Sequence, residues 1–133
     1  MSNTKATGVA YLDPEFSTCY ATEEIGYASG AQGTVTQATD KSTGVTLNKS
    51  AGRITMNAAS LAANTAVSFT LTNNTISTND AIIVNVSGGA TAAAYTTYIS
   101  SMAAGSAVVT LRNLTGGALA EAVVLNFAII HGA

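Results

Sequence analysis

The feature that most constrains this chain is an internal repeat of short, alternating segments. Residues 60–86 align with residues 101–127, and the aligned tracts include Thr70-Leu-Thr-Asn73 with Thr110-Leu-Arg-Asn113 after a one-residue slip, and Asp80-Ala-Ile-Ile-Val-Asn-Val86 with Glu121-Ala-Val-Val-Leu-Asn-Phe127. Each copy has an apolar face that it cannot bury alone, so two copies should pack together. The repeat therefore predicts a pseudo-symmetric antiparallel β architecture with little chain left over for an active site.

Period-two hydrophobic patterning continues from residue 34 to the C-terminus. In residues 66–73 it places Val67, Phe69 and Leu71 on one face of a strand. The continuous apolar run 81–86 is typical of a strand buried on both sides. Turn residues separate the segments at 73–74, 88–89, 104–105 and 116–117. We predict an all-β fold, an antiparallel β-sandwich or jelly-roll-like barrel of about eight strands, formed by residues 34–133 as two related halves.

Residues 1–33 differ from the rest and are predicted to form an extended N-terminal arm that could include one short strand. They contain half of the eight aromatic residues and four of the seven acids. Those acids, against Lys5 alone, give this segment a charge of −3, whereas residues 34–133 carry +1. Alternation is weak here, and Gly26, Gly30 and Gly33 interrupt the later part.

The arm also carries the candidate partner-binding residues. Pro14 disfavours helix at the preceding residue and extends the segment, which reduces the ordering cost of binding. Large apolar side chains on such an arm are the usual anchors of protein interfaces. We predict that the arm binds a neighbouring protein; the alternative is that it folds back on its own sandwich. The predicted contact residues are Tyr11, Leu12, Pro14, Phe16 and Tyr20.

The composition excludes several classes of partner. Charged residues make up only 9% of the chain and the net charge is −2, so the polar surface consists of short neutral side chains that suit packing against protein. The five basic residues form no cluster, so no nucleic-acid partner is expected. No apolar stretch approaches a membrane span, and no hydrophobic leader follows Met1, so we expect synthesis in a cytoplasm.

Reactive residues are few. His131 is the only histidine and Cys19 the only cysteine, and catalysis by either would need a nucleophile or base and an orienting partner within reach. The acids of the arm lack the spacing of a calcium loop. We predict no catalytic residue, no cofactor and no metal, and a small β-fold hydrolase is the least favoured alternative. Four Asn-x-Ser/Thr triplets, which begin at residues 48, 73, 85 and 113, are interpreted as chance in a chain rich in Asn and Thr.

Several tracts resemble structural proteins of tailed bacteriophages. They are Gly33-Thr-Val-Thr-Gln-Ala-Thr-Asp-Lys-Ser-Thr-Gly-Val-Thr-Leu-Asn-Lys49, Gly52-Arg-Ile-Thr-Met-Asn-Ala-Ala-Ser-Leu-Ala-Ala-Asn64, Val67-Ser-Phe-Thr-Leu-Thr-Asn73 and the C-terminal tract from Gly116. The resemblance covers about residues 26–133, and such modules resemble head decoration (cement) proteins. It implies a virion building block without catalytic residues that binds the outer capsid surface as an oligomer and reinforces the shell.

On this basis we expect a homotrimer that clamps neighbouring major capsid proteins together. It would lie on the capsid exterior of the virion after synthesis in the bacterial cytoplasm. Related β modules occur in head fibres and tail appendages, so the alternative is an appendage that binds a host receptor or glycan, for which Tyr95 and Tyr98 are the candidate residues.

Overall fold

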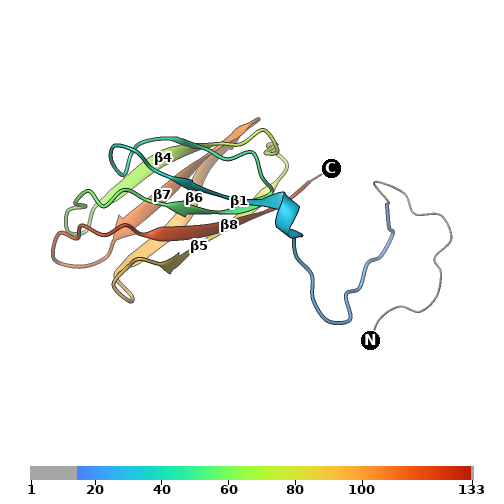
Figure 1. The fold of residues 1–133 in the computed structure, drawn as a ribbon, viewed down its shortest axis with the longest axis horizontal. Helices are drawn as coiled ribbons and strands as arrows, with labels where there is room; N and C mark the ends of the chain where they lie inside the picture. The colour runs from blue at the N-terminus through green and yellow to red at the C-terminus, as the bar shows by residue number, and fades with distance from the viewer. Residues whose placement is uncertain (1–14, 133) are drawn as a thin grey trace.

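The computed structural model describes residues 15–132, and residues 29–132 form a β-sandwich of two four-stranded sheets (Figure 1). A 3₁₀ turn, η1 (Ser29–Ala31), precedes the first strand. The strands are β1 (Gln32–Thr36), β2 (Val45–Thr46), β3 (Ala51–Thr55), β4 (Ala66–Thr72), β5 (Ala81–Gly88), β6 (Tyr95–Ala103), β7 (Ser106–Asn113) and β8 (Val124–Ile130). The first sheet has the order β1-β3-β8-β5 and the second β2-β4-β7-β6. The prediction of an all-β sandwich of about eight strands is confirmed.

Both sheets are mixed, although the sequence predicts an antiparallel fold. β1 pairs with β3 in parallel, and β2 pairs with β4 in parallel, while the other four pairings are antiparallel. From β1 to β5 the chain crosses to the opposite sheet at every connection. A strand and the next one in the same sheet are then separated by two reversals, so they run in the same direction.

The two copies of the sequence repeat lie side by side. β4 of the first copy pairs with β7 of the second, and β5 pairs with β8. In the pair of β4 and β7, Val67 lies opposite Leu111 and Leu71 lies opposite Ala107. Leu71 and Leu111 are equivalent residues of the two copies. This reciprocal register is what a local two-fold axis between the copies would produce.

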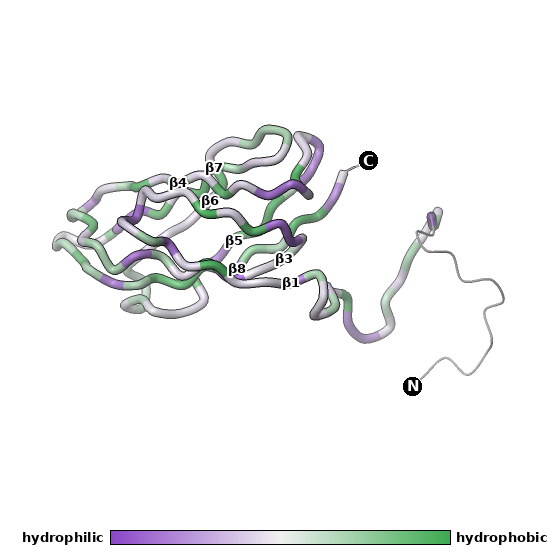
Figure 2. The backbone as a smooth tube through the Cα atoms, turned by 45° about the horizontal axis from the view of Figure 1, so that its top comes forward, coloured by the Kyte–Doolittle hydropathy of each residue, from purple (hydrophilic) through white to green (hydrophobic). Residues whose placement is uncertain are grey.

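The core lies between the sheets, and it follows from the alternation of each strand. Ile54, Leu71, Leu111 and Leu125 are among its fully buried side chains. Each buried aliphatic side chain of this size contributes about 1.5–3 kcal/mol relative to its exposed state. In Figure 2 apolar residues recur along the strands of both sheets, and they recur in the arm as well. No helix within residues 15–132 has the length and apolar character needed to cross a membrane.

β5 departs from its prediction. The run 81–86 was expected to be buried on both sides, but its residues alternate between exposed and half-buried. Ile82, Val84 and Val86 face the core, whereas Ile83 faces outward and is 56% exposed. The reason is that within residues 15–132 the sandwich has only two layers, and no element covers the outer face of the first sheet.

Two buried asparagines occupy equivalent positions in the repeat. Asn73 follows β4 and Asn113 ends β7, and both are fully buried. Each Oδ1 accepts hydrogen bonds from the backbone N–H and the hydroxyl of the threonine two residues later, Thr75 (3.0 and 2.7 Å) or Thr115 (2.9 and 2.8 Å). Two of the Asn-x-Thr triplets are therefore turns in which the side chain stands in for a backbone partner.

At the end of the sandwich that is remote from the arm, polar side chains tie the loops together. The Lys41 ammonium is buried and donates to the carbonyl oxygens of Asn57 (2.6 Å) and Glu121 (2.5 Å). Burial lowers the pKa of Lys41, and the negative charge of Glu121 opposes that shift. The Glu121 carboxylate accepts from the backbone N–H and the hydroxyl of Thr91 (3.0 and 2.6 Å). Four loops distant in sequence are thereby closed onto one another.

Candidate functional site

The described part of the arm, residues 15–28, contains no helix or strand and extends away from the sandwich (Figure 1). Its large apolar side chains face solvent: Phe16 is 69% exposed, and Tyr20 and Ile25 are each 89% exposed. Of the five predicted contact residues, Phe16 and Tyr20 are thus accessible to a partner. Tyr11, Leu12 and Pro14 lie outside the described residues.

The base of the arm is fixed to the first sheet. The Tyr27 hydroxyl donates to the carbonyl oxygen of Ile129 in β8, and Gln32 Nε2 donates to the carbonyl oxygen of Tyr27 (2.7 Å). The Lys49 ammonium donates to the carbonyl oxygen of Gly30 (2.9 Å). These bonds set the direction in which the arm leaves, and they place it beside the C-terminal end of β8.

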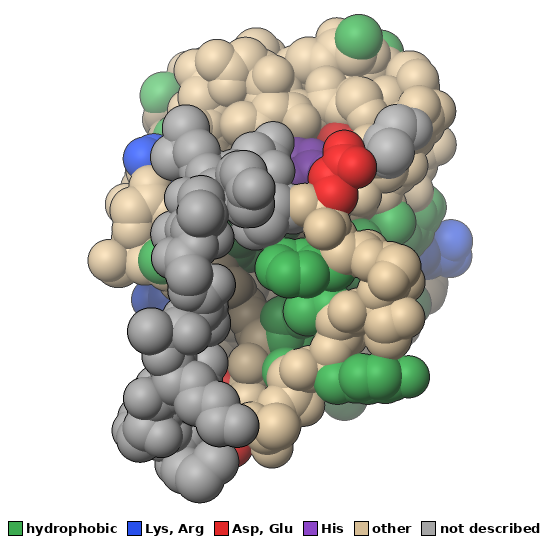
Figure 3. Space-filling view, turned by 90° about the vertical axis from the view of Figure 1, so that its right-hand side faces the viewer, with side chains coloured by type: hydrophobic (Ala, Val, Ile, Leu, Met, Phe, Trp, Pro, Cys, Tyr) green, Lys and Arg blue, Asp and Glu red, His purple; other side chains and the backbone are tan. Residues whose placement is uncertain are grey.

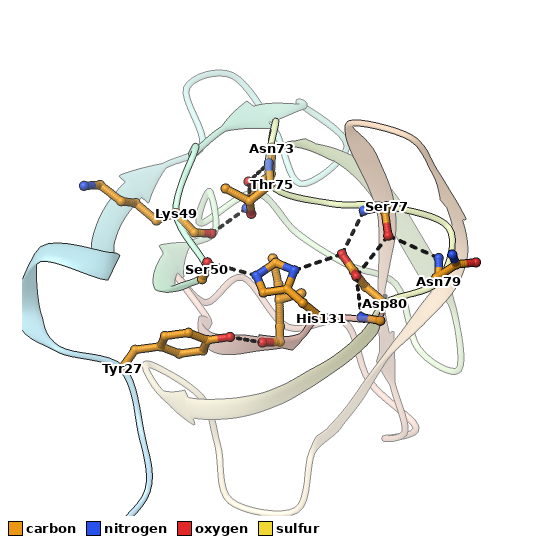
Figure 4. Close-up of polar contacts among 11 residues, drawn as sticks. Tyr27, Lys49, Ser50, Asn73, Thr75, Ser77, Asn79, Asp80 and His131 are labelled. Carbon is orange, nitrogen blue, oxygen red and sulfur yellow. Dashed lines mark hydrogen bonds and ion pairs between the residues drawn. The ribbon is translucent and has the colours of Figure 1, made fainter. Parts of the chain in front are cut away.

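Asp80 organises the end of the sandwich next to the arm (Figure 4). Its carboxylate accepts from the backbone N–H and hydroxyl of Ser77 (2.8 and 3.0 Å) and from the backbone N–H of Gly132 (2.9 Å). The bond from the Ser77 backbone is the main cause that lowers the pKa of Asp80 to about 2, and the bonds from Gly132 and His131 act in the same direction. Asp80 is therefore an anion at neutral pH, and it holds the segment after β8.

His131 lies between Asp80 and Ser50, in the order of a serine-hydrolase triad. Its Nδ1 is 3.3 Å from Asp80 Oδ2, and its Nε2 is 3.1 Å from Ser50 Oγ (Figure 4). In such an order the histidine can accept the serine proton while the carboxylate orients the ring. The sequence identified His131 but neither partner, because the three residues are 30 and 51 positions apart and meet only in the folded chain.

The surroundings of this triad differ from those of a catalytic centre. A catalytic serine also needs donors for the oxyanion and a recess for the acyl group. A groove of about 580 Å³ is lined by residues of the arm base, β1, β3 and β8, and Ser50, Asp80 and His131 are not among them. Ser50 also accepts the backbone N–H of Ile129 at its carbonyl (2.8 Å). We interpret the three residues as a latch that fixes the end of β8, to which the arm base is bonded.

The groove opens onto an apolar half of the outer face of the first sheet. The strand register aligns Ala51, Ala128 and Ile83 in one row, and Ala81 and Ile130 in the next. Ile83 and Ile130 are 56% and 59% exposed. We call these five residues the apolar patch. Apolar side chains also gather on the end of the molecule from which the arm leaves, beneath the histidine (Figure 3).

The other half of the same face is polar. Arg53, Asn126 and Asn85 are aligned in one row across β3, β8 and β5. Asn126 Oδ1 accepts from Arg53 Nε (3.4 Å) and from the Ser87 hydroxyl (3.0 Å). Arg53 is exposed and also lines the groove, so it brings a positive charge to the border of the apolar patch.

Of the two tyrosines suggested for an appendage, only one is accessible. Tyr98 is exposed on the outer face of the second sheet, whereas Tyr95 packs against the core with its hydroxyl buried. Burial, with the neighbouring Glu121, raises the pKa of Tyr95 to about 12. Tyr95 therefore contributes to the core and is only partly exposed.

Within residues 15–132 there is no group of three or more His, Cys, Asp or Glu side chains that could hold a metal ion. Comparison with known proteins gives no relative for this chain: no protein-family model, no curated protein and no solved structure matches it. The arm, the groove and the surfaces of the sandwich are the features that bear on function.

Proposed function

We propose that this protein is a structural component of a bacteriophage particle, a head decoration protein that binds the outer capsid surface as an oligomer, with a homotrimer as the expected form. It would stabilise the shell by bridging neighbouring major capsid proteins. The observation that carries this proposal is the arm, which presents Phe16, Tyr20 and Ile25 to solvent beside a sandwich whose core is already complete. The phage capsid is proposed as the binding partner because several tracts of the sequence resemble phage decoration proteins.

The arm has the physical properties of an interface segment. Burying one of its large side chains would gain about 1.5–3 kcal/mol, which is too little for stable association alone because docking costs several kcal/mol in lost freedom. A specific contact needs roughly 1,000 Å² or more, so faces of the sandwich must take part as well. Repetition over a shell then multiplies modest contacts without new chemistry.

The outer face of the second sheet suits such packing. Its hydroxyl groups bond to one another: Thr110 Oγ1 lies 2.8 Å from the Ser68 hydroxyl and 3.0 Å from that of Ser100. Groups already paired in this way lose little when water is removed, because their hydrogen bonds remain. Arg112 is the only charged residue of β2, β4, β6 and β7. A neutral, internally bonded face can approach another protein with little desolvation cost.

The test is to delete residues 2–16 and measure occupancy on empty capsids of the cognate phage. We expect the deletion to abolish or strongly reduce binding, because it removes Phe16 and the other predicted contacts outside the described residues. Leu114→Ala, at an exposed apolar residue away from the arm, is the matched control and should retain full occupancy. Undiminished occupancy by a folded deletion variant would overturn the role of the arm, and binding to host cells but not to capsids would favour an appendage.

A serine hydrolase is the second candidate function. Ser50, His131 and Asp80 lie in the order that a catalytic triad requires. A fluorophosphonate probe distinguishes the two functions. Covalent labelling at Ser50 that His131→Asn abolishes would establish the hydrolase. An unlabelled Ser50 in protein that binds capsids would leave the latch with its structural role.

A further inference from the structure

Two unpartnered apolar surfaces meet at one end of this molecule. One is the arm, with Tyr20 and Ile25 almost fully exposed, and the other is the apolar patch, with Ile83 and Ile130 more than half exposed. β5 carries the sequence of a strand buried on both sides, yet its outward side chains are uncovered in a single copy. Each of these two surfaces therefore exposes apolar side chains that a protein partner could bury.

The base of the arm borders the patch of its own chain, because Gly26 and Tyr27 line the same groove as Ala51 and Ala128. Tyr27 is bonded to β8 and Gln32 opens β1, so the base lies across that side of the first sheet. Residues before it lead outward from the sandwich (Figure 1). Extended at about 3.3 Å per residue, residues 15–25 can span roughly 35 Å, whereas four strands about 4.8 Å apart are only about 14 Å wide. The arm is therefore long enough to cross the face of a neighbouring molecule.

We propose that residues 15–25 of one copy lie across the apolar patch and the adjoining groove of a second copy. The inference rests on the proposed function and makes it more specific, because it names the contact by which decoration subunits join one another. Phe16, Tyr20 and Ile25 supply the apolar contacts of the donating arm. Ile83, Ile130 and the groove beside Tyr27 receive them.

The charges of the two surfaces are complementary. Residues 15–28 include Glu15, Glu23 and Glu24 and no basic residue. The strands of the first sheet carry Arg53 and no acidic residue, and Lys49 precedes β3. Asp80 precedes β5 beside the apolar patch, and its carboxylate already accepts hydrogen bonds from Ser77 and Gly132. With both flanking residues included, positive charge exceeds negative charge on this surface. Attraction between unlike charges steers association and fixes its register, and salt weakens it. The same pattern disfavours contact between two arms, which repel each other.

The single cysteine of the chain makes this contact testable. Cys19 is exposed and lies in the arm between Phe16 and Tyr20. An affinity-tagged chain that keeps Cys19 is the donor, and an untagged Cys19→Ser, Ile83→Cys chain is the acceptor. Under mild oxidation of the mixture we expect a disulfide-linked heterodimer whose tryptic peptides join Cys19 to position 83, with a yield that falls several-fold in 1 M salt.

A matched acceptor controls for random collision. Cys19→Ser, Ser68→Cys places the new cysteine at an exposed site on the outer face of the second sheet, where no arm is expected. Cross-linking at least ten-fold weaker than at position 83 supports the proposal, and equal cross-linking overturns it. A chain with Cys19 and Ile83→Cys that closes only an internal disulfide, with no heterodimer in the mixture, also overturns it, because the arm then covers its own patch.

The outcome is separable from that of the proposed function. Capsid occupancy without a specific heterodimer would leave the decoration role in place and remove arm exchange. A specific heterodimer in a protein that does not bind capsids would establish arm exchange and remove the decoration role.

Discussion

The two ends of the sandwich differ in how much apolar surface they leave exposed. At the end remote from the arm, the ammonium of buried Lys41 and the carboxylate of Glu121 close the loops onto one another. At the arm end, Asp80 and His131 satisfy the polar groups just as fully, but Ile83 and Ile130 remain exposed beside an arm with more apolar side chains. At the first end, among the described residues, Leu114 is the one large apolar side chain that stays exposed. The second end is complete only in its hydrogen bonds, and this difference indicates where a partner belongs.

The largest expected effect is on the free energy of unfolding, which should fall for a core substitution but not for one in the arm. Leu125 is fully buried, so Leu125→Ala should lower the free energy of unfolding by about 2–5 kcal/mol through lost burial and the cavity that remains. Ile25→Ala is the matched control on the arm and should change it by less than about 0.5 kcal/mol in the isolated protein. Urea unfolding followed by circular dichroism measures both. A loss above 1 kcal/mol for Ile25→Ala would show that the arm packs on its own sandwich.

A smaller effect should separate the two copies of the repeat. Asn113 Nδ2 donates to three carbonyl oxygens, those of Leu61, Ala62 and Gly117, whereas Asn73 Nδ2 donates to that of Lys49 alone. Replacing either asparagine by alanine leaves buried backbone groups unpaired, at about 1–3 kcal/mol. We expect Asn113→Ala to be the more destabilising in the same urea experiment. Equal losses would mean that the shared bonds to the following threonine decide the effect.

The smallest effect concerns the latch and depends on pH. The pKa of Asp80 is lowered in the folded protein from 3.8 to about 2, so its ionised form stabilises the fold above about pH 4. That contribution is lost as the pH falls from about 4 to 2, when the carboxylate takes up a proton. Asp80→Asn should therefore show a shallower decline of melting temperature over this range than the unmodified protein. Parallel declines would show that Asp80 does not stabilise the end of β8 through its charge.

Local pattern was enough to predict the fold class. Period-two alternation in segments such as 66–72 specifies which face is buried, and that choice needs no knowledge of neighbours. The repeat likewise predicted two related halves, and their strands pair side by side. The Asn-x-Thr triplets that begin at Asn73 and Asn113 could have revealed the turns with buried asparagines, because they recur at equivalent places in the repeat.

The sequence by itself determined that this chain forms strands, which side chains face inward in alternating segments such as β4, and that its first residues carry acids and aromatics with no pattern of their own. Only the tertiary structure decided that β1 and β2 join their sheets in parallel, that Ser50, Asp80 and His131 meet, and that one side of β5 remains uncovered. The physical reason is one of range. Alternation is a property of adjacent residues, whereas strand order, contacts between distant segments and the cover of a sheet depend on how the chain crosses between its two layers.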